Sequence, residues 1–110
     1  MKQFSYLDNA DFAATVCDRE GKVLYQNARA VRRDGDVIGK NLYGCHSPAS
    51  CEMIRRMIET GMGNTYTIIR KGHRRLIHQT PWREDDGSVA GLIELSIDLP
   101  DNMVTLDKDS

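Results

Sequence analysis

The stretch that decides the fold is Thr15-Val16-Cys17-Asp18-Arg19-Glu20-Gly21-Lys22-Val23-Leu24-Tyr25-Gln26-Asn27, in which two apolar runs flank an acidic turn closed by glycine. The same arrangement returns near the end of the chain in Pro81-Trp82-Arg83-Glu84-Asp85-Asp86-Gly87-Ser88-Val89-Ala90-Gly91-Leu92-Ile93. Glycine adopts the positive φ that reverses the chain, and Asp18 and Asp86 are placed to accept hydrogen bonds from the turn backbone. Both stretches therefore predict β-hairpins.

Two segments between these hairpins, residues 65–70 and 74–80, are rich in β-branched residues and are joined by Lys71-Gly72, which predicts another hairpin. Residues 89–98 form the last expected strand, with Ile93, Leu95 and Ile97 alternating with polar residues. The total is five strands. Because sequential hairpins need no crossover except one helical segment, the sheet is expected to be antiparallel.

The clearest helix pattern begins at Ser47, a good N-cap, with Pro48 at the first helical position. Ile54 and Met57 start an apolar stripe with helical spacing, and Gly61 is a natural end. We expect the apolar side of this helix to face a core and its charged side to face solvent.

Three stretches occur in an order and spacing that resemble the PAS sensor domain: the first hairpin ending in Tyr25-Gln26-Asn27-Ala28, the segment Val37-Ile38-Gly39-Lys40-Asn41-Leu42, and Thr80-Pro81 through Ile97-Asp98-Leu99. The resemblance covers residues 8–100. It implies an α+β fold with a five-stranded antiparallel sheet in the order 2-1-5-4-3, and with short helices and one longer helix on one face. We expect residues 1–7 to form an N-terminal segment that contacts a second copy, and residues 101–110 to form a flexible tail.

Length and composition restrict the class of protein. A chain of 110 residues, 40% of them hydrophobic, suits one compact domain. With 15 basic and 16 acidic residues, no overall field attracts nucleic acid or an anionic membrane. The chain shows no signal peptide and no apolar run of the ~18 residues that a membrane span needs, so we expect a cytoplasmic protein. Its three cysteines lack C-x-x-C spacing, which predicts free thiols and excludes c-type haem attachment.

Cys45-His46 immediately precedes the capped helix and is the most interesting local site. The positive end of a helix lowers the pKa of a thiol, so Cys45 is a candidate redox-sensing thiol or haem ligand, with His46 as the competing ligand. The alternative is that Cys45 is a small buried residue and His46 an ordinary exposed one. A structural zinc site made of Cys45, His46 and Cys51 would need His73 or His78 as its fourth ligand. His73 is expected at a hairpin tip on the solvent side, so no metal site is predicted.

The PAS resemblance implies a pocket between the helices and the inner sheet face, which in some relatives holds haem, flavin or a small metabolite. The Cys-His-Ser-Pro stretch differs from the usual flavin-binding pattern, which disfavours flavin. Met53, Met57, Tyr66 and Trp82 either line such a cavity or fill a core, and the role of His78 depends on which face of its strand it occupies. The predicted ligand-binding residues are Cys45, His46, Met53, Met57, Tyr66, His78 and Trp82.

No phosphate-binding loop, H-E-x-x-H or G-x-S-x-G motif is found, so we expect a non-enzyme. The first hypothesis is a sensor or regulatory module that binds a small ligand or a partner protein, forms a homodimer and acts on a downstream signalling protein. The second is a ligand-free dimerisation scaffold that pairs through its outer sheet face or through Phe4, Tyr6 and Leu7. The third is a haem- or thiol-based redox sensor that uses Cys45 and His46. The basic segment 70–75 lacks interleaved aromatic residues, so nucleic-acid binding is not expected.

Overall fold

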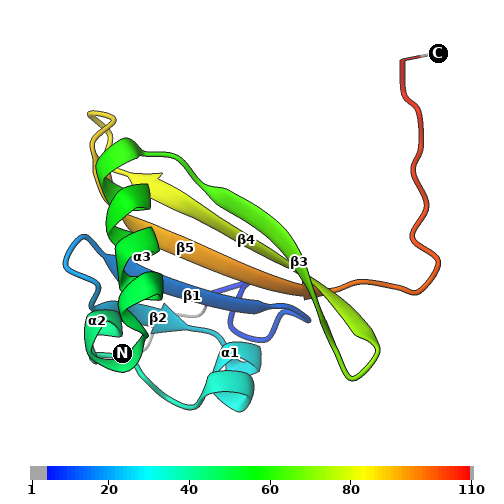
Figure 1. The fold of residues 1–110 in the computed structure, drawn as a ribbon, viewed down its shortest axis with the longest axis horizontal. Coiled ribbons are helices and arrows are strands. Elements are labelled where there is room, and N and C mark those ends of the chain that lie inside the picture. Colours follow the sequence, from blue (N-terminus) through cyan, green and yellow to red (C-terminus); the bar gives the residue numbers. More distant parts are fainter. Residues whose placement is uncertain (1–4, 110) are drawn as a thin grey trace.

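The computed structural model describes residues 5–109, except for the side chain of Cys45. One antiparallel sheet contains β1 (Ala13–Asp18), β2 (Val23–Gln26), β3 (Asn64–Arg70), β4 (His73–Arg83) and β5 (Val89–Asp98), in the order β2-β1-β5-β4-β3. The helices are α1 (Ala28–Asp34), α2 (Leu42–Cys45) and α3 (Pro48–Thr60), and α3 lies across the sheet (Figure 1). The expected fold class and strand order are therefore confirmed.

The acidic turns form as the sequence predicts. In the first hairpin, Asp18 Oδ1 accepts hydrogen bonds from the backbone N–H groups of Glu20 and Lys22, at 3.0 and 2.9 Å. In the last hairpin, Asp86 Oδ1 accepts from both the N–H and the hydroxyl of Ser88, at 2.9 and 2.7 Å. These bonds lower the pKa of Asp86 below its ordinary value. Each aspartate thus fixes the backbone at the point where the chain reverses.

β3 and β4 are joined by a tight two-residue turn. Lys71 and Gly72 both have positive φ, 52° and 79°, which is the requirement of a type I′ hairpin turn. β4 then continues through Pro81 to Arg83, beyond the last residue that pairs with β3, Gln79. Proline is tolerated there because β4 has lost its neighbour on that side.

Helix α3 follows the predicted pattern at both ends and along its apolar face. The Ser47 hydroxyl accepts from the N–H of Ser50 at 3.2 Å, and Gly61 ends the helix in the left-handed conformation with φ of 72°. Ile54, Met57 and Ile58 of α3 are buried and pack against Cys17 of β1 and Leu92 of β5. Cys51 is the fourth buried residue of the helix. The helix prediction is confirmed.

β5 presents its polar residues to the helix side of the sheet. Leu92 belongs to the core under α3, and strand alternation places Glu94 and Ser96 on the same face. Ser96 is buried, at 6% exposure. Ile93 and Ile97 therefore lie on the outer face, where they are half-buried. Polar side chains consequently enter the layer between the sheet and the helices.

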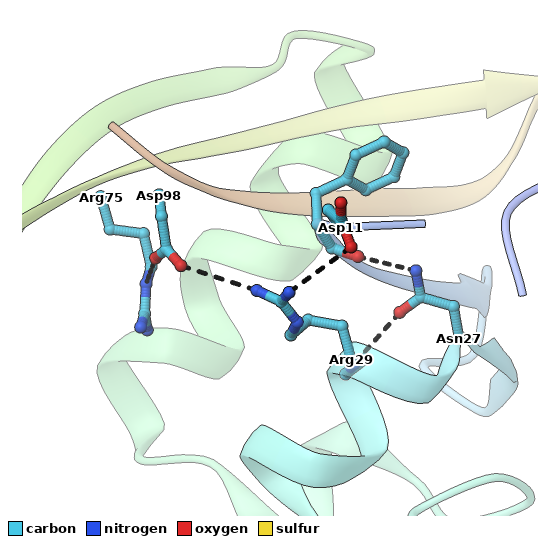
Figure 2. A network of polar contacts seen from close by, with 7 residues as sticks. Asp11, Asn27, Arg29, Arg75 and Asp98 are labelled. Carbon is cyan, nitrogen blue, oxygen red and sulfur yellow. Dashed lines mark hydrogen bonds and ion pairs between the residues drawn. The ribbon is translucent and has the colours of Figure 1, made fainter. Parts of the chain in front are cut away.

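Asn27, between β2 and α1, joins three parts of the chain. Its side-chain oxygen accepts from the backbone N–H groups of Ala14 and Ala30, both at 3.0 Å, and its amide nitrogen donates to the carbonyls of Leu7 and Phe12 at 3.0 and 2.7 Å. Figure 2 shows Asn27 at the start of α1. The residue is 1% exposed. Its four hydrogen bonds tie the segment before β1 to β1 itself and to the start of α1.

The sequence predicts an N-terminal segment over residues 1–7 and a flexible tail over residues 101–110, and the structure describes part of each. Phe4 lies outside the described residues, whereas Tyr6 and Leu7 are 94% and 43% exposed. Between Asp98 and residue 109 the structure shows neither helix nor strand, and the chain extends away from the sheet (Figure 1). Within residues 5–109, no helix is both long enough and apolar enough to cross a membrane. The N-terminal dimer contact and the flexibility of the tail stay predictions.

Candidate ligand-binding cavity

A cavity of about 440 Å³ lies between the inner sheet face and the helical layer. Its volume falls within the range of ~300 to 1,000 Å³ that is usual for small-molecule sites. All strands and helices contribute to its wall. Its lining residues include Thr15, Cys17, Gln26, Arg33, Asp34, Val37, Leu42, His46, Ser50, Met53, Ile54, Met57, Tyr66, Gln79, Leu92 and Glu94.

A row of four polar residues crosses the sheet side of this cavity. Gln26 of β2 pairs with Thr15 of β1, Thr15 pairs with Glu94 of β5, and Glu94 pairs with Gln79 of β4. Directly paired residues have side chains on the same face, so the row spans four adjacent strands. The opposite wall, from α3, is largely apolar, with Ile54 and Met57 among the residues at the cavity. The cavity thus combines a polar floor with an apolar roof.

Gln79 and Glu94 form the centre of the floor. Gln79 Nε2 donates a hydrogen bond to Glu94 Oε2 at 2.8 Å. Because a carboxylate can only accept, this bond fixes the orientation of the Gln79 amide. Its other atom, Oε1, is buried and has no hydrogen-bond partner in the described part of the chain. Such an unpaired buried acceptor costs about 1 to 3 kcal/mol, and residues of this kind are frequent at functional sites.

Gln26, at one end of the row, contrasts with Gln79. Its Nε2 donates to the carbonyl of Gly35 at 3.0 Å, and its Oε1 accepts from the N–H of Val37 at 2.9 Å. The residue is 7% exposed. Gln26 therefore uses its amide to hold the loop after α1, which is a structural role, whereas the amide of Gln79 is only half used.

Two titratable side chains at the cavity have raised pKa values. Burial raises the pKa of the Tyr66 phenol above its ordinary value, and the Glu94 carboxylate raises it further, while Arg33 opposes the shift. Burial also raises the pKa of the Cys17 thiol. Both groups accordingly stay protonated at neutral pH, so Tyr66 and Cys17 supply neutral O–H and S–H groups to the wall.

Four of the predicted binding residues lie at the cavity: His46, Met53, Met57 and Tyr66. Met57 is 6% exposed and is also part of the core, whereas Met53 and Tyr66 are 49% and 41% exposed. The side chain of His46 is exposed, and its Nδ1 lies 3.1 Å from the carbonyl oxygen of Leu42. The structure brings these four residues together, and their binding of a ligand stays a prediction.

His78 and Trp82 do not line the cavity. Ile77 points inward and is 2% exposed, so strand alternation places His78 on the outer face, where its Nδ1 lies 2.8 Å from Thr65 Oγ1. The Trp82 indole nitrogen donates to the carbonyl of Cys17 at 2.9 Å, which ties β4 to β1. We therefore leave both residues out of the proposed site.

The chemistry predicted for Cys45 concerns a side chain outside the described atoms, so the redox and haem hypotheses that use it stay predictions. The neighbouring Cys51 is buried and free, and its Sγ lies 3.5 Å from the carbonyl oxygen of Tyr43 and 3.7 Å from that of His46. Among the described side chains, no three His, Cys, Asp or Glu residues gather closely enough to hold a metal ion.

The sequence reasoning missed the polar row. Glu94 alternates with apolar neighbours and so looks like a solvent-facing residue, and Gln79 lies in a strand whose facing the pattern leaves open. The available signal was the pairing of the strands: once β4 is placed beside β5, Gln79 and Glu94 are opposite each other. Pairing register is not encoded in either segment alone.

Comparison with known proteins finds one matching family and several similar solved structures. Residues 7–102 match the model of the PAS fold family. No curated protein matches the chain. Among solved structures, VqmA from Vibrio cholerae is 25% identical with a TM-score of 0.66, and the match covers 86% of this chain and 48% of VqmA, so the chain spans about half the length of that protein.

Two further similar structures come from histidine kinases. The PAS domain of the histidine kinase ThkA is 19% identical with a TM-score of 0.63, covering 79% of this chain and 98% of that domain. A sensory box sensor histidine kinase from Vibrio cholerae is also 19% identical with a TM-score of 0.63, covering 86% of each chain. At this identity the two support the fold alone. Since the family match extends over nearly the whole sequence, this chain belongs to the PAS fold family.

Proposed function

We propose that this chain is a sensor module that binds a small molecule in the cavity and passes a change in packing to a partner protein or a second copy. The observation that carries the proposal is the polar floor made by Gln79 and Glu94 in a cavity of ligand size. A site that served only as a core would favour apolar side chains, because burying polar groups without partners is costly. Small-molecule sites, in contrast, combine apolar walls with a few convergent polar groups.

VqmA, which is similar to this chain over part of its length, is a protein that binds a ligand. Its structures include one bound to DPO and one of a complex with a ligand and DNA. Because this chain spans about half of VqmA, we take from that relative only that it binds a ligand, and we propose that the matched domain is where this chain binds its own.

Haem fits the described residues poorly. The carboxylate of Glu94 and the amide of Gln79 would face the apolar macrocycle, and His46, the described candidate for an iron ligand, is exposed. The cavity favours a smaller and more polar ligand, so no step of the proposed mechanism uses haem.

Helix α1 connects the cavity to the end of the sheet. Arg33 and Asp34, near its C-terminal end, line the cavity. At its start, Arg29 Nη1 lies 3.6 Å from Asp98 Oδ2, and Asp98 also accepts a hydrogen bond from Arg75 Nε at 3.0 Å (Figure 2). Asp98 is the last residue of β5, where the chain leaves the sheet. We propose that a ligand displaces α1 and that Arg29 and Asp98 relay this displacement to the C-terminal segment.

The alternative function is a ligand-free dimerisation scaffold. The observation in its favour is the outer sheet face, where Ile93, Leu95 and Ile97 are half-buried and apolar. Partly exposed apolar strips on a sheet face are typical of protein–protein contacts. A dimer whose mass equals that of two chains with no bound ligand would favour the scaffold over the sensor.

Native mass spectrometry of protein purified from its natural host tests the proposed function. We expect a non-covalent adduct on the wild-type chain. Met57→Trp should fill the cavity and abolish the adduct, because Met57 is buried at its wall. Met62→Trp is the matched control, since Met62 is 70% exposed and does not line the cavity. Bare polypeptide mass for the wild type, or an adduct that survives Met57→Trp, would contradict ligand binding in this cavity.

A further inference from the structure

We propose that the ligand is a small cationic molecule with N–H donors, such as an amine or amidine, and that it binds to the Glu94 carboxylate. The inference rests on the proposed function and specifies the chemistry of its ligand. It follows from the distribution of charge and of unused hydrogen-bond acceptors at the cavity floor.

Glu94 has no cationic partner in the described part of the chain. The ion pairs there join Arg29, Arg33 and Arg75 to aspartates, and none includes Glu94. Its Oε2 accepts a hydrogen bond from Gln79, which is the one side-chain hydrogen bond of Glu94 among residues 5–109. A partly buried carboxylate without a counter-ion is costly, and a cation placed beside it relieves that cost.

The other charged residues of the wall do not change the preference of the cavity for a cation. Arg33 and Asp34 both line the cavity, and Arg33 Nε lies 3.6 Å from Asp34 Oδ1, so their charges largely cancel. His46 is the remaining titratable residue besides Tyr66 and Cys17, and it lies at the exposed rim of the cavity. Glu94 is thus the uncompensated charge of the floor, and it selects against anions.

Gln79 supplies a second acceptor next to the first. Its amide is held by Glu94 so that Oε1 is the atom left without a partner. That atom is covered by protein, so a ligand reaches it only when neighbouring side chains move. We therefore assign Glu94 as the first contact of the ligand and Gln79 as a second contact, which accepts a hydrogen bond from the ligand after binding. A ligand with two N–H groups on one edge, as in an amidinium, matches both acceptors.

Three probes of one size and shape test the inference: benzamidine, benzamide and benzoate. Each is titrated into the ¹⁵N-labelled chain, and binding is followed by NMR through the side-chain NH₂ signals of Gln79. We expect benzamidine to bind about tenfold or more tightly than benzoate, with benzamide between them. Glu94→Gln should remove the preference for benzamidine and leave benzamide binding, whereas Glu84→Gln, an equal charge change in the last hairpin outside the cavity wall, should keep the wild-type order.

The inference is overturned if benzoate binds as tightly as benzamidine, if none of the three probes shifts the Gln79 signals, or if Glu94→Gln leaves the order unchanged. Its failure is distinguishable from failure of the proposed function. An anionic adduct in native mass spectrometry that Met57→Trp abolishes would keep the sensor and refute the cationic ligand. Bare polypeptide mass together with no binding of any probe would refute both.

Discussion

Replacing the polar pair by apolar residues in Gln79→Met/Glu94→Leu should stabilise the folded chain while removing ligand binding. The Oε1 atom of Gln79 is buried without a partner, and its removal regains about 1 to 3 kcal/mol. The hydrogen bond between Gln79 and Glu94 disappears, but no partner is left unpaired because both residues change. We expect the double variant to gain about 1 to 3 kcal/mol in free energy of unfolding. Proteins commonly give up stability of this size at functional sites.

The single variant Gln79→Met separates the two contributions. It relieves the unpaired acceptor but deprives Glu94 of its donor, and a hydrogen bond to a charged group contributes about 1.5 to 3 kcal/mol. The gain and the loss nearly cancel, so its stability should stay within about 1 kcal/mol of the wild type. Gln26→Met is the matched control, because Gln26 uses both amide atoms. It should lose about 2 to 4 kcal/mol.

Urea unfolding measures all three variants through the fluorescence of Trp82, the single tryptophan of the chain. The double variant should unfold at a higher urea concentration than the wild type with an unchanged slope. A double variant that is less stable than the wild type by more than about 1 kcal/mol would refute the reasoning, because the polar floor would then be a source of stability and not a cost accepted for binding.

Four further predictions concern the framework around the cavity. Asn27→Ala removes four hydrogen bonds and should lower the free energy of unfolding by about 3 to 5 kcal/mol. A loss of less than about 1 kcal/mol in urea unfolding would contradict the role of Asn27 in joining three parts of the chain. In Gly91→Ala, the added Cβ would overlap the carbonyl oxygen of Cys17, so circular dichroism should show loss of the fold, and a native spectrum would be the opposing result. Burial raises the pKa of the Cys17 thiol above 9.0, so the unfolded chain loses this proton at a lower pH than the folded chain does, and the free energy of unfolding should fall as the pH rises past that value. Cys17→Ala should lack this part of the fall, and identical pH profiles of stability for the two proteins would contradict the prediction. Arg29→Ala breaks only partly exposed ion pairs and should cost less than about 1 kcal/mol in free energy of unfolding, yet the NMR signal of Asp98 should no longer respond to benzamidine; an unaltered response would exclude the relay.

The local parts of the fold follow from short motifs. Asp18 and Asp86 with the glycines of their turns predict two hairpins, and Ser47, Pro48 and Gly61 delimit α3, because these residues act on their own backbone. Strand order is different. It depends on pairings between segments far apart in the chain, and it was available only through the resemblance to PAS domains.

The site was predictable only in part, for a related reason. Met53 and Met57 follow helical spacing, so their place on the inner side of α3 can be anticipated from one segment. Glu94 and Gln79 lie on strands where polar and apolar residues alternate, and nothing local shows that the polar face of β5 is the inner one. Trp82 is the opposite case, a residue that the sequence suggests for the cavity wall but that the structure places elsewhere. It lies on the other side of the sheet, where it ties two strands together.

The most direct test is a crystal structure of the chain purified from its natural host. The proposed function predicts density for a small molecule between α3 and the sheet, with a nitrogen atom of the ligand within hydrogen-bond distance of Glu94 and with the amide of Gln79 turned toward it. A cavity that holds only water, or that is closed by the side chains of α3, would contradict the assignment of this domain as a small-molecule sensor.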